Sequence, residues 1–141
     1  MIRQYWALLF LPLGMGLLGA GANAESARID YTLHCMGCHL EDGAGTPGKV
    51  PALKGRIGAL LHVAGGREYL VQVPGTAQSA LDDARVAAVL NWILHNFSDD
   101  QLPRDFEPYT GAEVAALRTP LADVAKVREG LLRELEQLEL D

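Results

Sequence analysis

The sequence has few cysteines and too few basic residues to balance its acidic ones. Of 141 residues, two are cysteine, 12 are Lys or Arg and 18 are Asp or Glu, which gives a formal net charge of −6. Such a chain lacks the basic face that nucleic-acid phosphates require, so nucleic acid is excluded as a partner. Two cysteines cannot make a disulfide framework. Because 49% of the residues are hydrophobic, however, the chain can bury a core without one.

The N-terminal segment predicts export. Arg3 lies in a short polar start, an apolar run follows over Trp6–Leu18, and Ala22–Ala24 reads A-N-A just before Glu25. A positive start, a short apolar stretch and a small-x-small site together are typical of a secretory signal peptide. The alternative is an uncleaved membrane anchor, for which the run is short. We predict that residues 1–24 are a signal peptide and that the mature chain is periplasmic, with no membrane span.

The two cysteines form a motif with the histidine that follows them. Cys35 and Cys38 are three residues apart, and His39 comes next. A bridge between the cysteines would close a tiny loop and constrain little, and no strand pattern supports a thioredoxin-like redox pair. A structural zinc site would need two of the four histidines as further ligands. Cys-x-x-Cys-His is the attachment pattern of c-type haem. We therefore predict one haem c, bound covalently through both cysteines and ligated by His39.

Residues around the motif match the pattern of a known family. Tyr31 lies four residues before the first cysteine, and Ala27 lies one helical turn earlier. Pro51 lies twelve residues after the motif histidine, and Leu53 follows two residues later. Through these residues the chain, from Ala27 to Phe97, resembles the class I monohaem cytochromes c.

The resemblance implies an all-α, class I cytochrome c-like helical core around one haem. The carbonyl of Pro51 would accept a hydrogen bond from Nδ1–H of His39, which meets the need of a ligating histidine for a second fixed partner. Leu53 would pack on the haem. The family ends its core with a helix that packs an aromatic residue on the first helix. Leu81–Phe97 fits this helix, with Trp92 as the aromatic residue. Its predicted apolar face consists of Val86, Val89, Leu90, Ile93 and Phe97.

The chain lacks the methionine that the family places before this helix as the distal iron ligand. The segment Val73–Ala80 contains none, and the three methionines of the chain are Met1, Met15 and Met36. Two lie in the predicted signal peptide and the third is tethered between the cysteines, so methionine is excluded as the ligand by count. We favour His62 as the distal ligand. The alternatives are an open or water-occupied iron, a lysine, an asparagine or another histidine.

Two arginines are predicted to bind the haem propionates. Arg56 and Arg67 follow the motif loop, and a guanidinium can form paired hydrogen bonds with a carboxylate. The alternatives are that they form a docking rim around the exposed haem edge or that they are ordinary solvated surface residues.

Residues 98–141 lie beyond the resemblance. Their first part is acidic, contains prolines and is predicted to be a linker. Thr110–Glu113 then matches a capping box, which predicts the start of a short helix. A longer helix is predicted from Thr119–Pro120 to the C-terminus. Arg128 interrupts its near-heptad stripe of leucines and valines. This helix either folds onto its own core or forms a dimer seam or a docking surface for a redox partner.

The features together predict an exported electron carrier and not an enzyme. It would pass single electrons between periplasmic partners such as a dehydrogenase and a downstream cytochrome or oxidase. One alternative is a haem-based ligand-binding or peroxidase-like protein with an open distal iron. Another is a cytochrome subunit of a dehydrogenase complex. The predicted domain division is 1–24 signal peptide, 25–97 cytochrome c domain and 98–141 linker and helical extension.

Overall fold

The computed structural model describes residues 20–138, and within this range it contains no β-strand. The elements in chain order, with η for a short 3-10 helix, are α1 (Ala20–His34), α2 (Met36–His39), η1 (Gly58–His62), α3 (Gly66–Gln72), α4 (Pro74–Ala77), α5 (Asp83–Ser98), η2 (Asp99–Gln101), α6 (Gly111–Leu117) and α7 (Val124–Leu138). The predicted all-α fold class is confirmed.

Most of the predicted signal peptide, residues 1–24, lies outside the described range. Helix α1 begins at Ala20 and runs without a break past the predicted cleavage site after Ala24. Cleavage therefore stays a prediction. Between residues 20 and 138, no helix combines the length and the apolar content that a membrane crossing needs.

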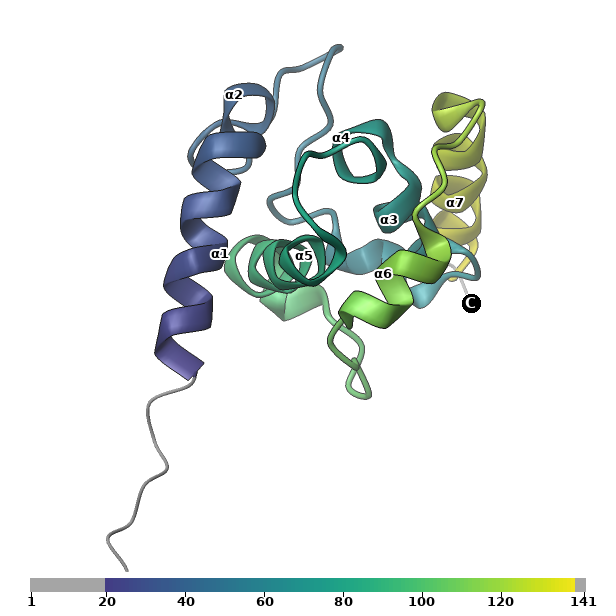
Figure 1. Cartoon of the computed structure of the whole chain (residues 1–141). Coiled ribbons are helices and arrows are strands. Elements are labelled where there is room, and N and C mark those ends of the chain that lie inside the picture. The colour runs from purple at the N-terminus through teal and green to yellow at the C-terminus, as the bar shows by residue number, and fades with distance from the viewer. Residues whose placement is uncertain (1–19, 139–141) are drawn as a thin grey trace, which may run out of the picture.

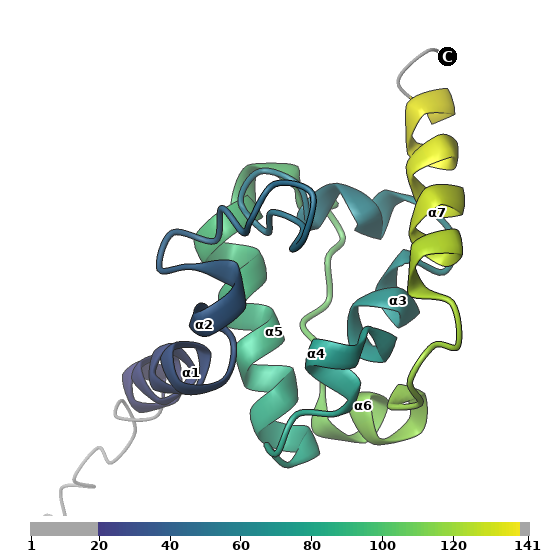
Figure 2. The same ribbon diagram turned by 90° about the horizontal axis from the view of Figure 1, so that it is seen from above.

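Helix α5 lies in the middle of the molecule. Figures 1 and 2 show α1 and α2 on one side of it and α3, α4, α6 and α7 on the other. The side chain of Asp82 caps the helix by accepting a hydrogen bond from the backbone N–H of Arg85 at 2.9 Å. Of the five residues in the predicted apolar face, all but Phe97 are buried, and Phe97 packs on the core as a half-buried residue.

Aromatic residues fill the crossing of α1 and α5, as predicted. Tyr31 and Ala27 are buried on α1, and the ring of Tyr31 lies 5.1 Å from that of Trp92 between centroids. Trp92 in turn meets Phe97 edge to face at 5.5 Å. Such pairs contribute about 0.5–1.5 kcal/mol each beyond their buried area, so this cluster fixes α1 against α5.

An ion pair joins the same two helices. The carboxylate of Asp30 on α1 is only 2% exposed, and it accepts two hydrogen bonds from Arg85, at 3.1 Å from Nε and 2.5 Å from a terminal nitrogen. These two charge-assisted hydrogen bonds compensate the free-energy cost of burying the carboxylate. The pair sets the position of the motif at the C-terminal end of α1.

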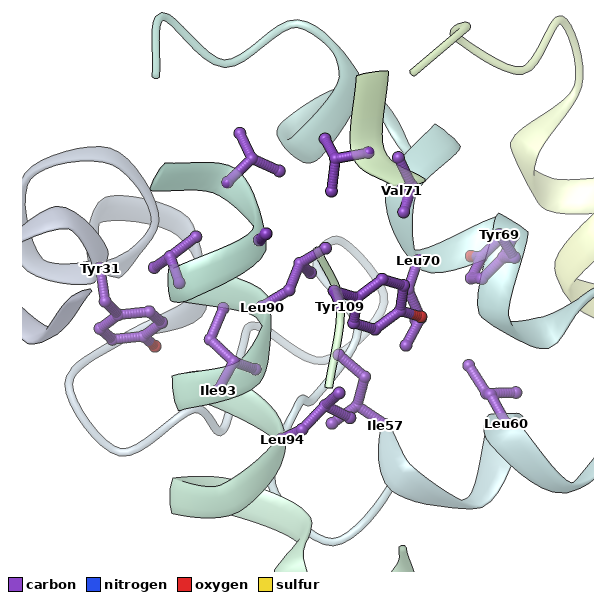
Figure 3. Packing of buried hydrophobic residues seen from close by; sticks show 14 of the residues in the cluster. Tyr31, Ile57, Leu60, Tyr69, Leu70, Val71, Leu90, Ile93, Leu94 and Tyr109 are labelled. Carbon is purple, nitrogen blue, oxygen red and sulfur yellow. The ribbon is translucent and has the colours of Figure 1, made fainter. Parts of the chain in front are cut away.

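The segment predicted to be a linker is bound to α5. The backbone N–H and C=O of Tyr109 pair with the side chain of Asn91 at 2.8 and 2.9 Å, and its hydroxyl donates to the carbonyl of Arg67 at 2.8 Å. Figure 3 shows the Tyr109 ring within the buried cluster. Thr110 caps α6 by accepting from the N–H of Glu113 at 3.2 Å, which confirms this half of the predicted capping box, whereas the Glu113 carboxylate pairs with Arg67.

The last helix begins later than predicted. Helix α7 starts at Val124, because Asp123 caps it by accepting from the N–H of Lys126 at 3.0 Å. The prediction that Thr119–Pro120 begins this helix is therefore wrong. Leu131 is buried, and α7 packs on η1 and α3. Of the alternatives for this helix, the structure shows one that folds onto its own core.

Candidate functional site

A cavity of about 790 Å³ lies beside α5, and its walls come from most of the chain. Cys35, Cys38 and His39 form one wall, and residues 49–60 form the next. Residues 69–81 and the inner face of α5 form two more, and α7 contributes the last. A volume of this size is typical of sites for cofactors, and most of the lining side chains are apolar.

The charges on this cavity all have one sign. Among residues 20–138, no Asp or Glu lines it, although the whole chain contains 18 acidic residues. The charged side chains that do line it are Lys49, Arg56 and Arg128. A cofactor with a large apolar body and carboxylate groups fits these walls, because its anionic groups meet cations and no like charge. Haem, with two propionates, is such a cofactor.

The motif residues are brought to one wall by a single helical turn. The N–H groups of Cys38 and His39 both donate to the carbonyl of Cys35, at 3.2 and 3.0 Å. Burial raises the pKa of Cys35 to about 11, and the negative charges of Asp30 and Cys38 add to this shift. A redox-active cysteine has instead a lowered pKa, so the environment of Cys35 does not suit a thioredoxin-like pair.

The structure also gives no support to a zinc site. Within residues 20–138, no three His, Cys, Asp or Glu side chains are grouped as they would be around a metal ion. His95 lies at the surface and pairs with Asp99 at 2.7 Å. His34 lines the cavity beside Cys35 and is exposed.

His39 is held from behind by a loop carbonyl. Its Nδ1 lies 3.2 Å from the carbonyl oxygen of Pro51, so the predicted hydrogen bond is present. Burial lowers the pKa of His39, and the contact with Pro51 opposes this shift in part. The neutral imidazole, which is the metal-binding form, is therefore favoured, with Nε2 left free. Leu53 lines the cavity nearby and is half-buried.

The loop that carries Pro51 depends on a glycine. Gly45 has a φ of +65°, and its N–H donates to the carbonyl of His39 at 3.0 Å. A Cβ atom at this position would lie 2.5 Å from the carbonyl oxygen of Val50. Only glycine allows the loop to fold this closely under the motif histidine.

A strained residue follows the motif. Leu40 has a φ of +66° and a ψ of 169°, a conformation that costs a residue other than glycine about 1–3 kcal/mol. Its N–H donates to Met36 at 2.8 Å, and its carbonyl accepts from the hydroxyl of Tyr31 at 2.5 Å. These two bonds hold the chain where it turns away from His39. Burial raises the pKa of Tyr31 to about 12, so the hydroxyl remains a donor.

The prediction that His62 ligates the iron is not supported. His62 is exposed on η1 and does not line the cavity. Its Nε2 lies 2.8 Å from the carbonyl oxygen of Gln101, a residue far away in the sequence. The imidazole therefore fastens η1 to η2 at the surface and does not face the cavity.

Of the two predicted propionate-binding arginines, the structure places only Arg56 at the cavity. Arg67 makes a paired contact with Glu113 at 2.5 and 2.8 Å, and its guanidinium stacks 4.1 Å from the ring centroid of Tyr109. This pairing lowers the pKa of Glu113. Arg67 therefore joins α3 to α6 and does not line the cavity, so the structure gives no support to its predicted role at the propionates.

Sequence reasoning missed Arg128 as a residue of the cavity. Arg128 is half-buried on α7, lines the cavity and has no carboxylate partner among residues 20–138. It lies near Tyr69, whose pKa is raised by burial and lowered in part by the Arg128 charge. The signal in the sequence was the interrupted apolar stripe, since a cation on the inner face of a packed helix needs an anion to meet.

The wall away from the motif is fixed by the C-terminal extension. The guanidinium of Arg118 donates to the carbonyls of Ala77 at 3.1 Å and Leu81 at 2.8 Å and also to that of Ser79. It pairs with Asp83 at 2.9 Å as well. One side chain thus holds the whole turn between α4 and α5.

Comparisons with known proteins give two clear relatives. No family model matches the chain. A protein named cytochrome c-552 from Thermus thermophilus is 34% identical over 120 residues, which cover 72% of this chain and 81% of the relative. A second protein named cytochrome c-552, also from Thermus thermophilus, is 35% identical over 113 residues, which cover 67% of this chain and 85% of the relative. The matched share of this chain is larger than the Ala27–Phe97 core.

Proposed function

The chain belongs to the class I monohaem cytochrome c family, and we propose that it carries single electrons through one covalently bound haem c in the periplasm. The observation that carries the proposal is the cavity. It has the motif on one wall and apolar side chains around it, and the charged side chains that the described part of the chain contributes to it are all cationic. These walls suit haem and would not suit a cationic or strongly polar ligand.

The haem-binding roles follow from the residues on each wall. Cys35 and Cys38 would form the two thioether bonds, and His39 would ligate the iron through Nε2 while Pro51 fixes its ring. Leu53 would pack on the haem face. The bound haem supplies an iron that alternates between the ferric and ferrous states.

Cationic side chains would bind the propionates from two directions. Arg56 belongs to the loop after the motif and Arg128 to α7, and both line the cavity. Neither guanidinium has a carboxylate partner among the described residues. Each is therefore available to form paired hydrogen bonds with a propionate. The C-terminal extension becomes part of the cofactor site through Arg128.

Electron exchange needs a haem edge near the surface. Cys38 and His34 are exposed at the motif wall, so the haem edge attached to Cys38 would lie close to solvent. The acidic surface would steer the protein towards basic patches on its partners. We infer that these are a periplasmic dehydrogenase and a downstream cytochrome or oxidase.

The test is to express the full chain in a host that exports proteins and attaches haem c. We expect a haem that stays on the chain under denaturing conditions and one electron per chain in a redox titration. The intact mass should correspond to a chain that begins at Glu25. A Cys35→Ala, Cys38→Ala double variant should lose the covalent haem, whereas His39→Ala should keep it with an altered spectrum. A wild-type chain without covalent haem, exported and folded, would refute the proposal.

A further inference from the structure

The cavity wall that faces the motif offers iron only weak ligands. It is formed by the end of α3, by α4 and by the turn that follows, and Figures 1 and 2 show α4 across from α2. The lining residues here are Val73, Pro74, Gly75, Thr76 and Ser79. Their side chains carry two neutral hydroxyl groups and no imidazole, amine or thioether. Ferrous haem iron, a comparatively soft centre, binds such hydroxyls poorly.

The other donors that line the cavity are on the wrong side or in the wrong form. His34 directly precedes the first motif cysteine, and Lys49 lies two residues before Pro51, so both belong to the His39 side. Tyr69 lies at the edge of the core away from Tyr31 (Figure 3), where burial favours its neutral hydroxyl over the phenolate that would ligate iron.

Methionine cannot reach this wall from the mature chain. Met36 is fixed between the motif cysteines on α2. Met1 and Met15 lie outside the described residues and precede the predicted cleavage site after Ala24.

The wall is also held in place. Arg118 binds the backbone carbonyls of residues 77, 79 and 81, and Leu81 is buried against the core. A ligand from elsewhere in the chain would have to displace this clamped turn to reach the iron.

We propose that the distal position of the haem iron is a binding site for small, uncharged ligands with a free lone pair, represented by carbon monoxide and nitric oxide. The proposal rests on the haem binding proposed above. The wall that faces the motif carries no charged side chain, and the haem propionates would occupy the cations elsewhere in the cavity. Uncharged ligands are therefore favoured, because an ion would lose its hydration on entry without an opposite charge to meet. The ligand donates its lone pair to ferrous iron, and no bond in the protein is broken. Such binding would stabilise the ferrous state and so couple ligand occupancy to electron transfer.

The experiment is a carbon monoxide titration of the reduced, full-length haem protein. We expect a saturable shift of the main haem absorption band, with one ligand bound per haem. A reduced spectrum that stays low-spin and unchanged at saturating carbon monoxide would overturn this proposal. An alkaline pyridine assay on the same sample reports the covalent haem. Haem present with no ligand binding refutes only the open site, whereas haem absent refutes the proposed function as well.

Two methionine variants test which segment faces the iron. Thr76→Met places a thioether on the lining wall, and Gln78→Met places one two residues later on an exposed side chain that does not line the cavity. We expect Thr76→Met to become low-spin and to bind carbon monoxide at least tenfold more weakly, whereas Gln78→Met should behave like wild type. Equal binding by wild type and both variants, each folded and carrying haem, would overturn the placement of α4 against the iron.

Discussion

Arg118 gives the sharpest test of the idea that the C-terminal extension stabilises the cofactor cavity. Its side chain is only 15% exposed, and it donates to three backbone carbonyls and to Asp83. A hydrogen bond from a charged donor contributes about 1.5–3 kcal/mol, and less where water can replace the donor. Leu81 is buried, whereas Ala77 and Ser79 are half-buried and Asp83 is 41% exposed, so water can replace much of the donor at three of the four acceptors. We therefore count the bond to Leu81 at about 1.5 kcal/mol and the other three together at about the same, and Arg118→Ala should lower the free energy of unfolding by about 3 kcal/mol.

Denaturant unfolding of the haem protein, followed by far-ultraviolet circular dichroism, measures this loss. Arg118→Lys keeps the charge and the pairing with Asp83 but cannot reach three carbonyls at once, so we expect a loss of about 2 kcal/mol. Arg133→Ala is the control, because its exposed pair with Glu129 contributes about 0.5 kcal/mol or less. If Arg118→Ala loses less than about 1 kcal/mol, or if the lysine variant is as stable as wild type, the hydrogen bonds of Arg118 do not stabilise the turn as we infer.

Three further predictions concern the cavity and its supports. A cation near the propionates disfavours the ferric state, so Arg128→Gln should lower the reduction potential of the haem by on the order of 30–60 mV. A spectroelectrochemical titration measures this shift, and the control variant Arg133→Gln should leave the potential unchanged. Gly45→Ala would place a Cβ atom against the backbone, whereas Gly48→Ala has open space around it at a similar positive φ. Gly45→Ala should therefore destabilise the protein by at least about 2 kcal/mol more than Gly48→Ala. Equal losses of stability in the two variants would contradict this reasoning. Glu113, whose pKa is lowered by its arginine partner, contributes stability above its ordinary pKa that is lost as the pH falls through its folded pKa. Urea unfolding should thus show Glu113→Gln less stable than wild type at pH 7, and the difference should narrow as the pH falls below the ordinary glutamate pKa of 4.5.

Features set by short spacings could be predicted from the sequence. The turn that gathers Cys35, Cys38 and His39 is local, and the hydrogen bond to Pro51 follows from a fixed spacing in the family pattern. The apolar face of α5 repeats every three to four residues, and Thr110 caps α6 within one turn.

The site predictions that the structure does not support concern side chains that make contacts between distant parts of the chain. His62 is bound by Gln101, 39 residues later, and Arg67 by Glu113, 46 residues later. Nothing in the local pattern distinguishes a side chain that faces a cofactor from one that joins two surface segments. Arg128 is the opposite case: its place in an apolar stripe marked a half-buried charge, but its proposed partner, a haem propionate, belongs to a cofactor and not to the amino-acid sequence.

The wall formed by α7 also bears on the order of assembly. A chain that is made and exported from its N-terminus exposes Cys35 and Cys38 well before Val124–Leu138 arrives. Haem attachment at that moment would meet a half-built pocket, open on the side where α7 later packs. If haem is attached at that stage, α7 would pack over a cofactor that is already joined to the chain and would complete the wall of the site last.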